Sequence, residues 1–325
     1  MSERSWGNST ANTMMEDPRK SEADRLLEKG IELHQIRDFK GALDALEQSL
    51  VLYREIQDEQ GESRALNSLG LAYYALGSYG DAIAYSYQSL SLAHQMLDRR
   101  TERQALANLG NAYRHLGDHV RAIEYKQQSL AVAREIGDRR GEMASLNNLG
   151  MAYKAMGDCS SAISYYEQSL VVARELQDAQ VEGQVLRNLG NAYHALANYA
   201  QTVKCYEQLL SIARQLPDRQ VESQILKNLA SACYTMGDCA KAIQYHVERL
   251  AIARELNDQR HEEQVLENLG VIYDALGNYE KAIEYYEQRL VVARKIQDSK
   301  LEQQVLESIK TVCYAIGDFA KASQY

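Results

Sequence analysis

The sequence predicts an all-α fold, a solenoid built from helical hairpins. The first observation is an internal repeat: the segment ALANLGNAY at 105–113 returns forty residues later as SLNNLGMAY at 145–153. Related segments stand at the same spacing at 65–73, 185–193, 225–233, 265–273 and 305–313, and a looser match begins near Ala23. A fixed period of this length is typical of repeat proteins, in which each unit packs on its neighbours.

The second observation is the helical spacing of apolar residues within each repeat. In the second repeat Leu66, Leu69, Tyr73 and Leu76 follow one another at steps of three and four residues. This spacing places them on one face of a helix. Gly70 lies beside that face, and its small size allows a neighbouring helix to approach closely.

The third observation is the pair of residues that separates the two helices of each repeat. Gly77 can supply the left-handed conformation that ends a helix, and Ser78 can cap the next helix with its side-chain oxygen. The residues equivalent to Ser78 belong to the same capping set: Asp38, Asp118, Asp158, Asn198, Asp238, Asn278 and Asp318. In the fifth repeat Ala197 replaces the turn glycine. This departure indicates either a local change of superhelix pitch or sequence drift, and we favour drift.

A second helix follows, with Tyr79, Ala82, Ile83, Leu90 and Ala93 at helical spacing. A second series of aspartates then stands before the next repeat, where each can cap its first helix: Asp58, Asp98, Asp138, Asp178, Asp218, Asp258 and Asp298. A regular arginine series precedes these aspartates, and we expect each arginine to pair with a nearby glutamate: Arg134, Arg174, Arg214, Arg254 and Arg294. Each repeat is thus predicted to be a helical hairpin.

Composition narrows the function classes. The 325 residues carry a net charge of −9, which argues against nucleic acid as a ligand because phosphate binding needs a basic surface. No apolar run is long enough for a membrane span or a signal peptide, so we expect a cytoplasmic protein. The histidines form no cluster with ligand spacing, and we expect neither a metal nor another cofactor.

The five cysteines have a structural interpretation. Each stands at a repeat position that other repeats fill with an aromatic residue, where cysteine acts as a small apolar side chain: Cys159, Cys205, Cys233, Cys239 and Cys313. Their number is odd and no Cys-x-x-Cys occurs, so the sequence supports neither a disulfide framework nor a zinc site.

The repeats resemble the tetratricopeptide repeat. Leu109-Gly110-x-x-Tyr113 with Ala122, and the same pattern one repeat later, match its signature. The family period is 34 residues, whereas the forty-residue units here look like those of Pins/LGN adaptors and of bacterial arrays. The resemblance covers residues 21–325 and implies a right-handed superhelix whose first helices line a concave peptide-binding channel.

We therefore expect a disordered tail at 1–20, which holds Trp6, and a solenoid at 21–325 with seven full repeats and one incomplete repeat. The last repeat stops inside its second helix. Its Ile309, Val312 and Ile316 would then remain partly open. We accordingly expect the chain to continue beyond Tyr325, or this end to be covered by a partner or by a second copy of the protein.

Helical spacing also identifies the face of each first helix that points away from the second helix. Asparagine can hydrogen-bond an extended backbone, and arginine or lysine can pair with carboxylate or phosphate. The predicted site residues are Asn108, Asn111, Arg114, Asn147, Asn148, Lys154, Arg187, Asn188, Asn191, His194, Lys227, Asn228 and Asn268. They predict a channel for an extended, acidic or phosphorylated segment. The alternative is that the asparagines hydrogen-bond between helices and the charged residues are merely solvated.

One known variant of such a channel is not expected. Chaperone-binding tetratricopeptide domains hold a C-terminal carboxylate with Lys/Arg and Asn side chains from three consecutive repeats. The best frame uses Arg187, Asn191 and Asn228. Gln264 and Asn268 then occupy the last two cationic positions, which breaks the pattern.

No catalytic motif is present, and an open groove seldom shields reacting groups. The leading interpretation is a non-enzymatic scaffold or adaptor that binds a partner's peptide segment in the channel. The alternative is the regulatory or sensor arm of a larger enzyme or signalling protein, with the effector domain beyond residue 325.

Overall fold

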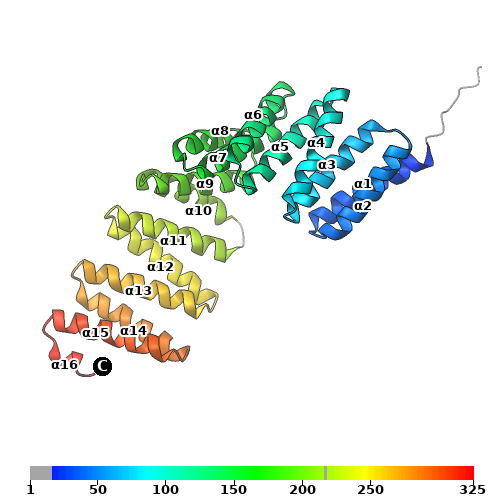
Figure 1. Ribbon diagram of the computed structural model, residues 1–325. Coiled ribbons are helices and arrows are strands. Elements are labelled where there is room, and N and C mark those ends of the chain that lie inside the picture. The colour runs from blue at the N-terminus through cyan, green and yellow to red at the C-terminus, as the bar shows by residue number, and fades with distance from the viewer. Residues whose placement is uncertain (1–16, 216–217) are drawn as a thin grey trace, which may run out of the picture. The chain divides into compact units, whose positions relative to one another are not determined.

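A computed structural model describes residues 17–215 and 218–325. All of the regular elements in these two ranges are helices, so the predicted all-α fold is confirmed (Figure 1). Trp6 and most of the predicted tail lie outside the described residues, and the first helix already begins at Pro18. The chain forms two compact units, which meet in sequence between Gly157 and Asp158.

The N-terminal unit holds the first seven helices. Each helix packs against the next one along the chain, and the odd-numbered helices also contact one another directly. The helices are α1 (Pro18–Gln35), α2 (Phe39–Glu55), α3 (Glu59–Ala75), α4 (Tyr79–Met96), α5 (Arg99–His115), α6 (His119–Glu135) and α7 (Arg139–Ala155).

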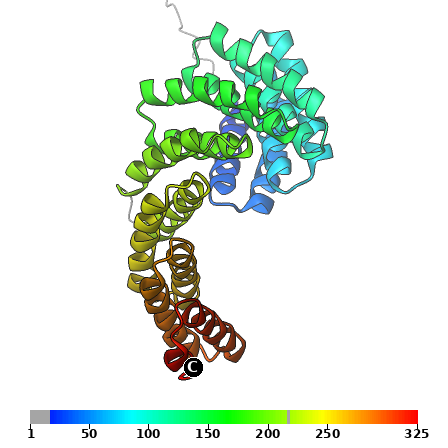
Figure 2. The same cartoon turned by 90° about the vertical axis from the view of Figure 1, so that its left-hand side faces the viewer.

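The C-terminal unit continues the same alternation. Its helices pack on their neighbours in chain order, as the run from green to red in Figure 2 shows. They are α8 (Cys159–Glu175), α9 (Ala179–Ala195), α10 (Tyr199–Ala213), α11 (Arg219–Thr235), α12 (Cys239–Glu255), α13 (Gln259–Ala275), α14 (Tyr279–Lys295), α15 (Ser299–Ala315) and α16 (Phe319–Ala322).

The predicted caps are present with one exception. The side chain of Asp58 accepts a hydrogen bond from the backbone N–H of Gly61 at 3.0 Å, and the other predicted Asp and Asn caps make equivalent bonds. The prediction for Ser78 is wrong, because its side chain makes no cap bond to the backbone. Its hydroxyl donates instead to Asp81 at 2.6 Å. A carboxylate is a strong acceptor for a hydroxyl proton, and the side chain of Ser78 is directed to it rather than to the backbone.

Left-handed residues end the helices, as predicted from the turn glycines. Gly77 has φ = 80° and Gly237 has φ = 83°. Ala197, which replaces the glycine in the fifth repeat, keeps the same backbone with φ = 55°. A β-carbon is strained in this region by about 1–2 kcal/mol.

Replacing Ala197 with glycine is therefore expected to stabilise the protein by about 1 kcal/mol, because the relief of strain exceeds the added flexibility of the unfolded chain. The reverse change, Gly237→Ala, is the matched control and is expected to destabilise the protein by a similar amount. Gly237→Ala alters no packed contact, because a β-carbon at this position has no neighbour within 4 Å. Urea denaturation of both variants measures the difference, and a less stable Ala197→Gly protein would contradict the strain argument.

Glycines in the first helices allow close packing against the second helices. A β-carbon added at Gly270 would lie 2.4 Å from the ring of Tyr286. At Gly110 it would lie 2.7 Å from the side chain of Lys126. This confirms that the small residues beside the apolar stripe bring the two helices of a hairpin together.

Gly270→Ala is expected to destabilise the protein by about 1–3 kcal/mol, because the rigid tyrosine ring must move. Gly183→Ala is the control: its β-carbon would meet Leu209 at 3.4 Å, an ordinary contact. In that helix interior alanine is favoured over glycine, so a gain of about 0.5–1 kcal/mol is expected. Thermal melts of the two variants should move in opposite directions, and parallel shifts would rule out the packing explanation.

The cysteine prediction holds for three of the five residues. Cys205, Cys233 and Cys313 are buried, whereas Cys159 and Cys239 are half-buried at the starts of their helices. Burial raises the pKa of Cys205 and Cys233 to about 11. These two thiols therefore stay protonated and unreactive at neutral pH.

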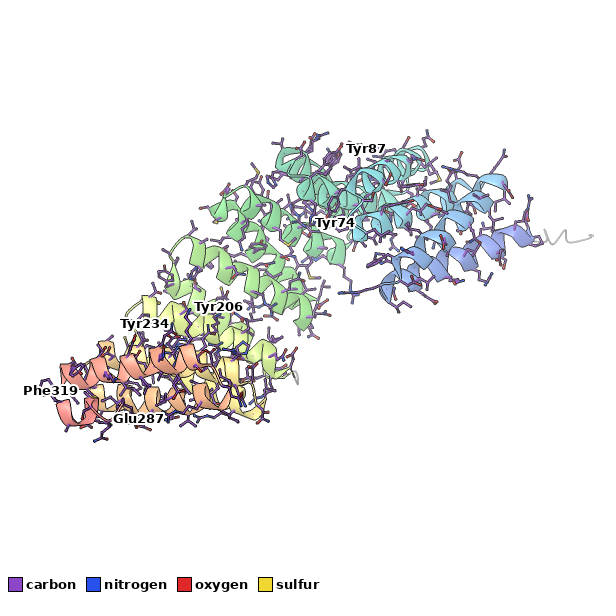
Figure 3. The ribbon with its side chains drawn as sticks, turned by 60° about the horizontal axis from the view of Figure 1, so that its bottom comes forward. Tyr74, Tyr87, Tyr206, Tyr234, Glu287 and Phe319 are labelled. Carbon is purple, nitrogen blue, oxygen red and sulfur yellow. The ribbon has the colours of Figure 1, made fainter. Side chains whose placement is uncertain are left out.

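The last repeat is better covered than the sequence suggested. Ile309 and Val312 were expected to be open, but they are buried in a cluster that also holds Ala322 of α16, with Tyr325 packed against it. The few residues of α16 are enough to close this cluster. Ile316 is 42% exposed and Phe319 is 68% exposed. Figure 3 labels Phe319 at this end of the chain. Of the three residues on which the prediction of an open end rested, only Ile316 is exposed.

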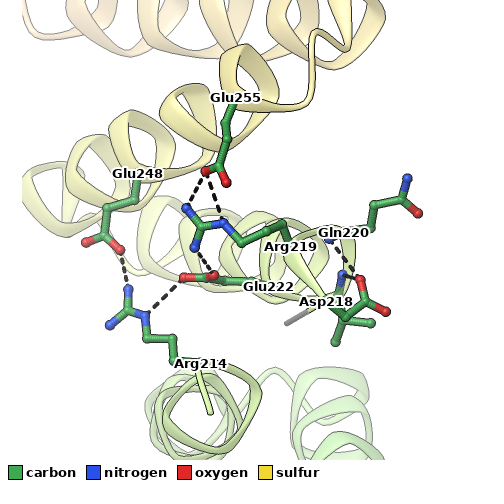
Figure 4. Close-up of polar contacts among 8 residues, drawn as sticks. Arg214, Asp218, Arg219, Gln220, Glu222, Glu248 and Glu255 are labelled. Atoms are coloured by element: carbon green, nitrogen blue, oxygen red, sulfur yellow. Dashed lines mark hydrogen bonds and ion pairs between the residues drawn. The ribbon is translucent and has the colours of Figure 1, made fainter. Parts of the chain in front are cut away.

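The regular arginine series pairs with glutamates, as predicted. Arg254 Nε contacts Glu262 Oε1 at 2.7 Å, and Arg134, Arg174, Arg214 and Arg294 make the same pair. Figure 4 shows one example, in which Arg214 also reaches Glu248 at 2.5 Å. Each pair joins the end of a second helix to the first turn of the next repeat, so these arginines hold the repeats together.

Candidate functional site

The predicted site residues all lie on odd-numbered helices. Those of the N-terminal unit are Asn108, Asn111 and Arg114 on α5, and Asn147, Asn148 and Lys154 on α7. Those of the C-terminal unit are Arg187, Asn188, Asn191 and His194 on α9, Lys227 and Asn228 on α11, and Asn268 on α13. The structure therefore gives two candidate faces, one in each unit, which we call the N-terminal face and the C-terminal face.

A hollow of about 400 Å³ lies on the N-terminal face. Polar and apolar side chains share its lining: Leu27 and Ile31 of α1, Arg64, Asn67, Ser68 and Leu71 of α3, and Arg103, Gln104, Ala107 and Asn108 of α5. Asn108 is the predicted site residue that lines it. The hollow thus lies between successive first helices, where the resemblance placed a ligand.

Several of the asparagines are engaged within the protein. Asn108 Nδ2 donates to the backbone oxygen and the Oδ1 of Asn67, at 3.3 and 3.0 Å. Asn111 Oδ1 accepts from Lys126 Nζ at 2.5 Å, and Asn191 Oδ1 accepts from the Tyr206 hydroxyl at 2.7 Å. For these three residues the alternative interpretation, hydrogen bonding between helices, describes the structure.

The cationic residues differ in exposure. Arg187 and Lys227 are exposed, whereas Arg114 and Lys154 are half-buried. Arg114 Nη2 lies 2.9 Å from Nε2 of His115, whose pKa is lowered by burial and by Arg114. Arg187 and Lys227 are therefore the predicted cations most accessible to a charged ligand.

Two hollows lie on the C-terminal face. The larger, about 570 Å³, is lined by Ala179, Gln180, Gly183, Gln184, Arg187, Leu209, Ile212, Ala213, Gln215 and Val221. The smaller, about 290 Å³, is lined by Gln220, Ser223, Gln224, Arg249, Ala253, Leu256, Asp258 and His261. In both, a second helix forms the floor between two first helices. Arg187 is the predicted residue that opens into one of them.

The sequence analysis missed the buried charged residues of the second helices. Lys126 and Arg249 are each only 1% exposed, and Arg289 is 5% exposed. A signal for them exists in the repeat alignment: Arg249 and Arg289 stand where Ser49, Ser89, Ser129, Ser169 and Leu209 stand in the other repeats. A long charged side chain at a position that other repeats fill with a small or apolar residue indicates that the packing of this hairpin differs from that of the others.

Family models support what the repeat pattern predicted. Models of the tetratricopeptide repeat match residues 27–92, 101–175, 182–255 and 265–300, which together make up more than half of the chain. The chain belongs to the tetratricopeptide repeat family. A comparison with curated protein sequences finds no significant match.

Solved tetratricopeptide repeat structures have the same fold. The apo form of RapI is 15% identical with a TM-score of 0.59, and the match covers 85% of this chain and 99% of that chain. A Rap protein complexed with Competence and Sporulation Factor is 18% identical, with a TM-score of 0.56. The match covers 85% of this chain and 76% of that chain. A STAND protein with a tetratricopeptide repeat sensor from Pyrococcus horikoshii is 17% identical, with a TM-score of 0.60. The match covers 96% of this chain and 52% of that chain.

Two further findings concern the part of the chain that the structure describes. None of its helices combines the length and the apolar character needed to cross a membrane. Within the same residues, no group of three or more His, Cys, Asp or Glu side chains is placed to hold a metal ion.

Proposed function

We propose that this tetratricopeptide repeat protein is a scaffold that binds an extended, acidic segment of a partner protein on the faces of its odd-numbered helices. Tetratricopeptide repeats support a protein-interaction or sensor role. The proposal adds a mode of binding. The ligand lies across the hollows between first helices, and the cations there favour a negatively charged ligand. We further propose that the protein acts in the cytoplasm and without catalysis of its own.

The observation that supports an acidic ligand is the arginine content of the three hollows. Arg64 lines the N-terminal one, together with Arg103, which already pairs with Asp138 at 2.9 Å. Arg187 lines the larger C-terminal one, and Arg249 lines the smaller one, which also holds Asp258. The whole chain carries a net charge of −9, so this placement runs against its average composition. Arginine favours carboxylate and phosphate because its planar donors match their oxygens.

The second candidate is the sensor arm of a larger signalling protein. The likeness to the Pyrococcus horikoshii protein, whose repeats are described as a sensor, motivates it. In that case ligand binding on the same faces would control a further domain. Both candidates require a bound segment, so the first experiment is the same.

A displayed library of linear peptides, selected against the whole chain, tests the proposed function. We expect enrichment of extended sequences with two or more Asp, Glu or phosphorylated residues, and weaker binding at high salt because exposed charges are screened. Enrichment of neutral or basic sequences, or of none, would contradict the proposal.

A further inference from the structure

Arg249 is a buried cation without a counter-ion of its own. It lies on α12, is 1% exposed, and its Nη2 donates to Gln264 Oε1 at 3.3 Å. Its Nε and Nη1 are buried and have no hydrogen-bond partner in the protein. A buried charge costs several kcal/mol unless it is paired and hydrogen-bonded. The two unused donors belong to a side chain that lines the 290 Å³ hollow between α11 and α13.

The next repeat shows how the same problem is solved within the protein. Arg289 occupies the equivalent position and is almost as buried, at 5% exposed. Its Nε donates to Glu263 Oε1 at 2.7 Å, and its Nη2 lies 3.1 Å from Glu267 Oε1. One repeat earlier the equivalents of these two glutamates are Ser223 and Lys227. The fold therefore has a place for a carboxylate beside this arginine, and in the Arg249 repeat the protein does not supply it.

The other charged groups around Arg249 do not neutralise it. Asp258 lines the same hollow, but its Oδ1 accepts from the backbone N–H of His261 at 3.1 Å and its Oδ2 lies 2.6 Å from His261 Nδ1. Burial lowers the pKa of Arg249, and Asp258 only opposes this effect. His246, also on α12, is buried with a pKa lowered to about 4, so it is neutral at physiological pH.

We infer that the hollow of Arg249, Ser223, Gln224 and Gln220 is a binding pocket for a single carboxylate group of a bound peptide. The carboxylate takes the place that Glu263 holds beside Arg289 and accepts from Nε and Nη1 of Arg249. Ser223 and the glutamines supply neutral donors around it, and Lys227 stands where the second glutamate stands in the next repeat. The inference rests on the proposed function, because a peptide side chain or C-terminus is the source of the carboxylate.

The pocket differs from the chaperone-type clamp considered from the sequence. That clamp uses first-helix residues of three repeats, whereas Arg249 projects from a second helix that forms the floor between two first helices. Water fits the volume, since one molecule needs only about 10–15 Å³. Water, however, supplies no negative charge to the guanidinium of Arg249. In the next repeat the equivalent guanidinium, that of Arg289, pairs with two glutamates.

The test uses small probes, so it does not depend on finding a protein partner. The whole chain is titrated with acetyl-glutamate-N-methylamide, with the neutral glutamine analogue and with inorganic phosphate at equal ionic strength. Two signals are recorded: the NMR resonance of the Arg249 Nε–Hε pair, and the heat of binding in isothermal titration calorimetry, which also measures probe binding in variants that lack this arginine. We expect a saturable shift with the glutamate probe, and binding weaker by about tenfold or more with the glutamine probe, because charged hydrogen bonds are the stronger ones.

Variants copied from other repeats serve as controls. Arg249→Leu reproduces the fifth repeat, where Leu209 holds this position, and Ser223→Glu reproduces the internal carboxylate of Glu263. Both are expected to abolish binding of the glutamate probe, and Ser223→Glu should also raise Tm. The double change Glu263→Ser with Glu267→Lys copies the Arg249 surroundings onto Arg289 and is expected to add a second responding arginine.

Three results would overturn the inference. They are equal shifts with the glutamate and glutamine probes, glutamate binding that persists in Arg249→Leu, and tighter binding of phosphate than of the carboxylate. The outcome is separable from that of the proposed function. If the glutamate probe binds but no peptide is selected, the Arg249 pocket is supported and the proposed scaffold function is contradicted. If an acidic peptide is selected and binds Arg249→Leu as tightly as the wild type, the scaffold function is supported and the pocket is contradicted.

Discussion

Lys126→Leu is expected to stabilise the protein at neutral pH, on the order of 2–4 kcal/mol, because the wild-type chain buries an ammonium group. Lys126 is 1% exposed and packs over Gly110. Burial, and to a lesser degree Arg114, lowers its pKa from 10.5 to about 7. Leucine fits the site, because Leu46 holds the equivalent position in the first repeat and packs over Gly30 in the same way.

The pH dependence of this difference identifies its cause. In the unfolded chain Lys126 binds a proton below about pH 10.5, whereas in the folded chain it does so only below about pH 7. Wild-type stability therefore rises with pH between these two values, since the unfolded state binds more protons there. Below pH 7 both states are protonated and the penalty is constant.

Urea denaturation of the two proteins from pH 6 to pH 10 measures the effect. The advantage of Lys126→Leu should be largest at pH 6–7 and should shrink steadily as the pH rises. Comparing the two proteins at each pH removes the contribution of tyrosines and cysteines that titrate in the same range. A difference that does not change with pH would mean that Lys126 remains charged and well solvated through its contact with Asn111.

Repeat spacing predicts those parts of the structure that depend on local chemistry. An aspartate before a helix finds backbone N–H groups whatever its neighbours are, so Asp58 and its counterparts could be assigned as caps from the sequence. The Arg254–Glu262 pair likewise joins residues only eight positions apart, on adjoining helix ends. These features recur because each repeat places the same atoms together.

The parts that could not be predicted depend on which side chains meet across helices. Ser86, Lys126, Tyr206 and His246 share one repeat position, yet they differ in size, charge and partners. Whether such a polar group is buried depends on the small residue opposite, for example Gly110 beside Lys126. The repeat pattern does not distinguish residues at equivalent positions. For the same reason it did not predict that Arg289 is paired with glutamates and that Arg249 is not.

The site prediction shows the same limit. Helical spacing placed Asn108 on the first-helix face, but it could not reveal that Asn67 of the preceding repeat takes its amide donors. Nor could it show that Lys154 and Arg187, which were both assigned to one predicted channel, belong to separate compact units. Exposure and partners, which only the three-dimensional structure gives, decide which of the predicted cations can meet a ligand.

Arg187→Glu is expected to weaken binding of an acidic peptide selected on the C-terminal face by roughly tenfold to hundredfold, about 1.4–2.8 kcal/mol. Arg187 is exposed and lines the largest of the three hollows, so the change replaces attraction by repulsion without disturbing a packed contact. Lys204→Glu on α10 is the matched control, because it makes the same charge change at an exposed residue that does not line the hollow. Fluorescence anisotropy with the labelled peptide measures both, and circular dichroism should show unchanged helicity.

Lys154→Glu tests the N-terminal unit separately. A peptide that binds this unit should lose affinity in Lys154→Glu and be indifferent to Arg187→Glu, and a peptide that binds the C-terminal unit should behave in the opposite way. The loss should also diminish at high salt, more for the exposed Arg187 than for the half-buried Lys154, because added ions screen exposed charges most strongly. If every selected peptide kept its wild-type affinity in both variants, the cations of the first helices would not select the ligand, and binding would have to depend on the neutral residues of the hollows.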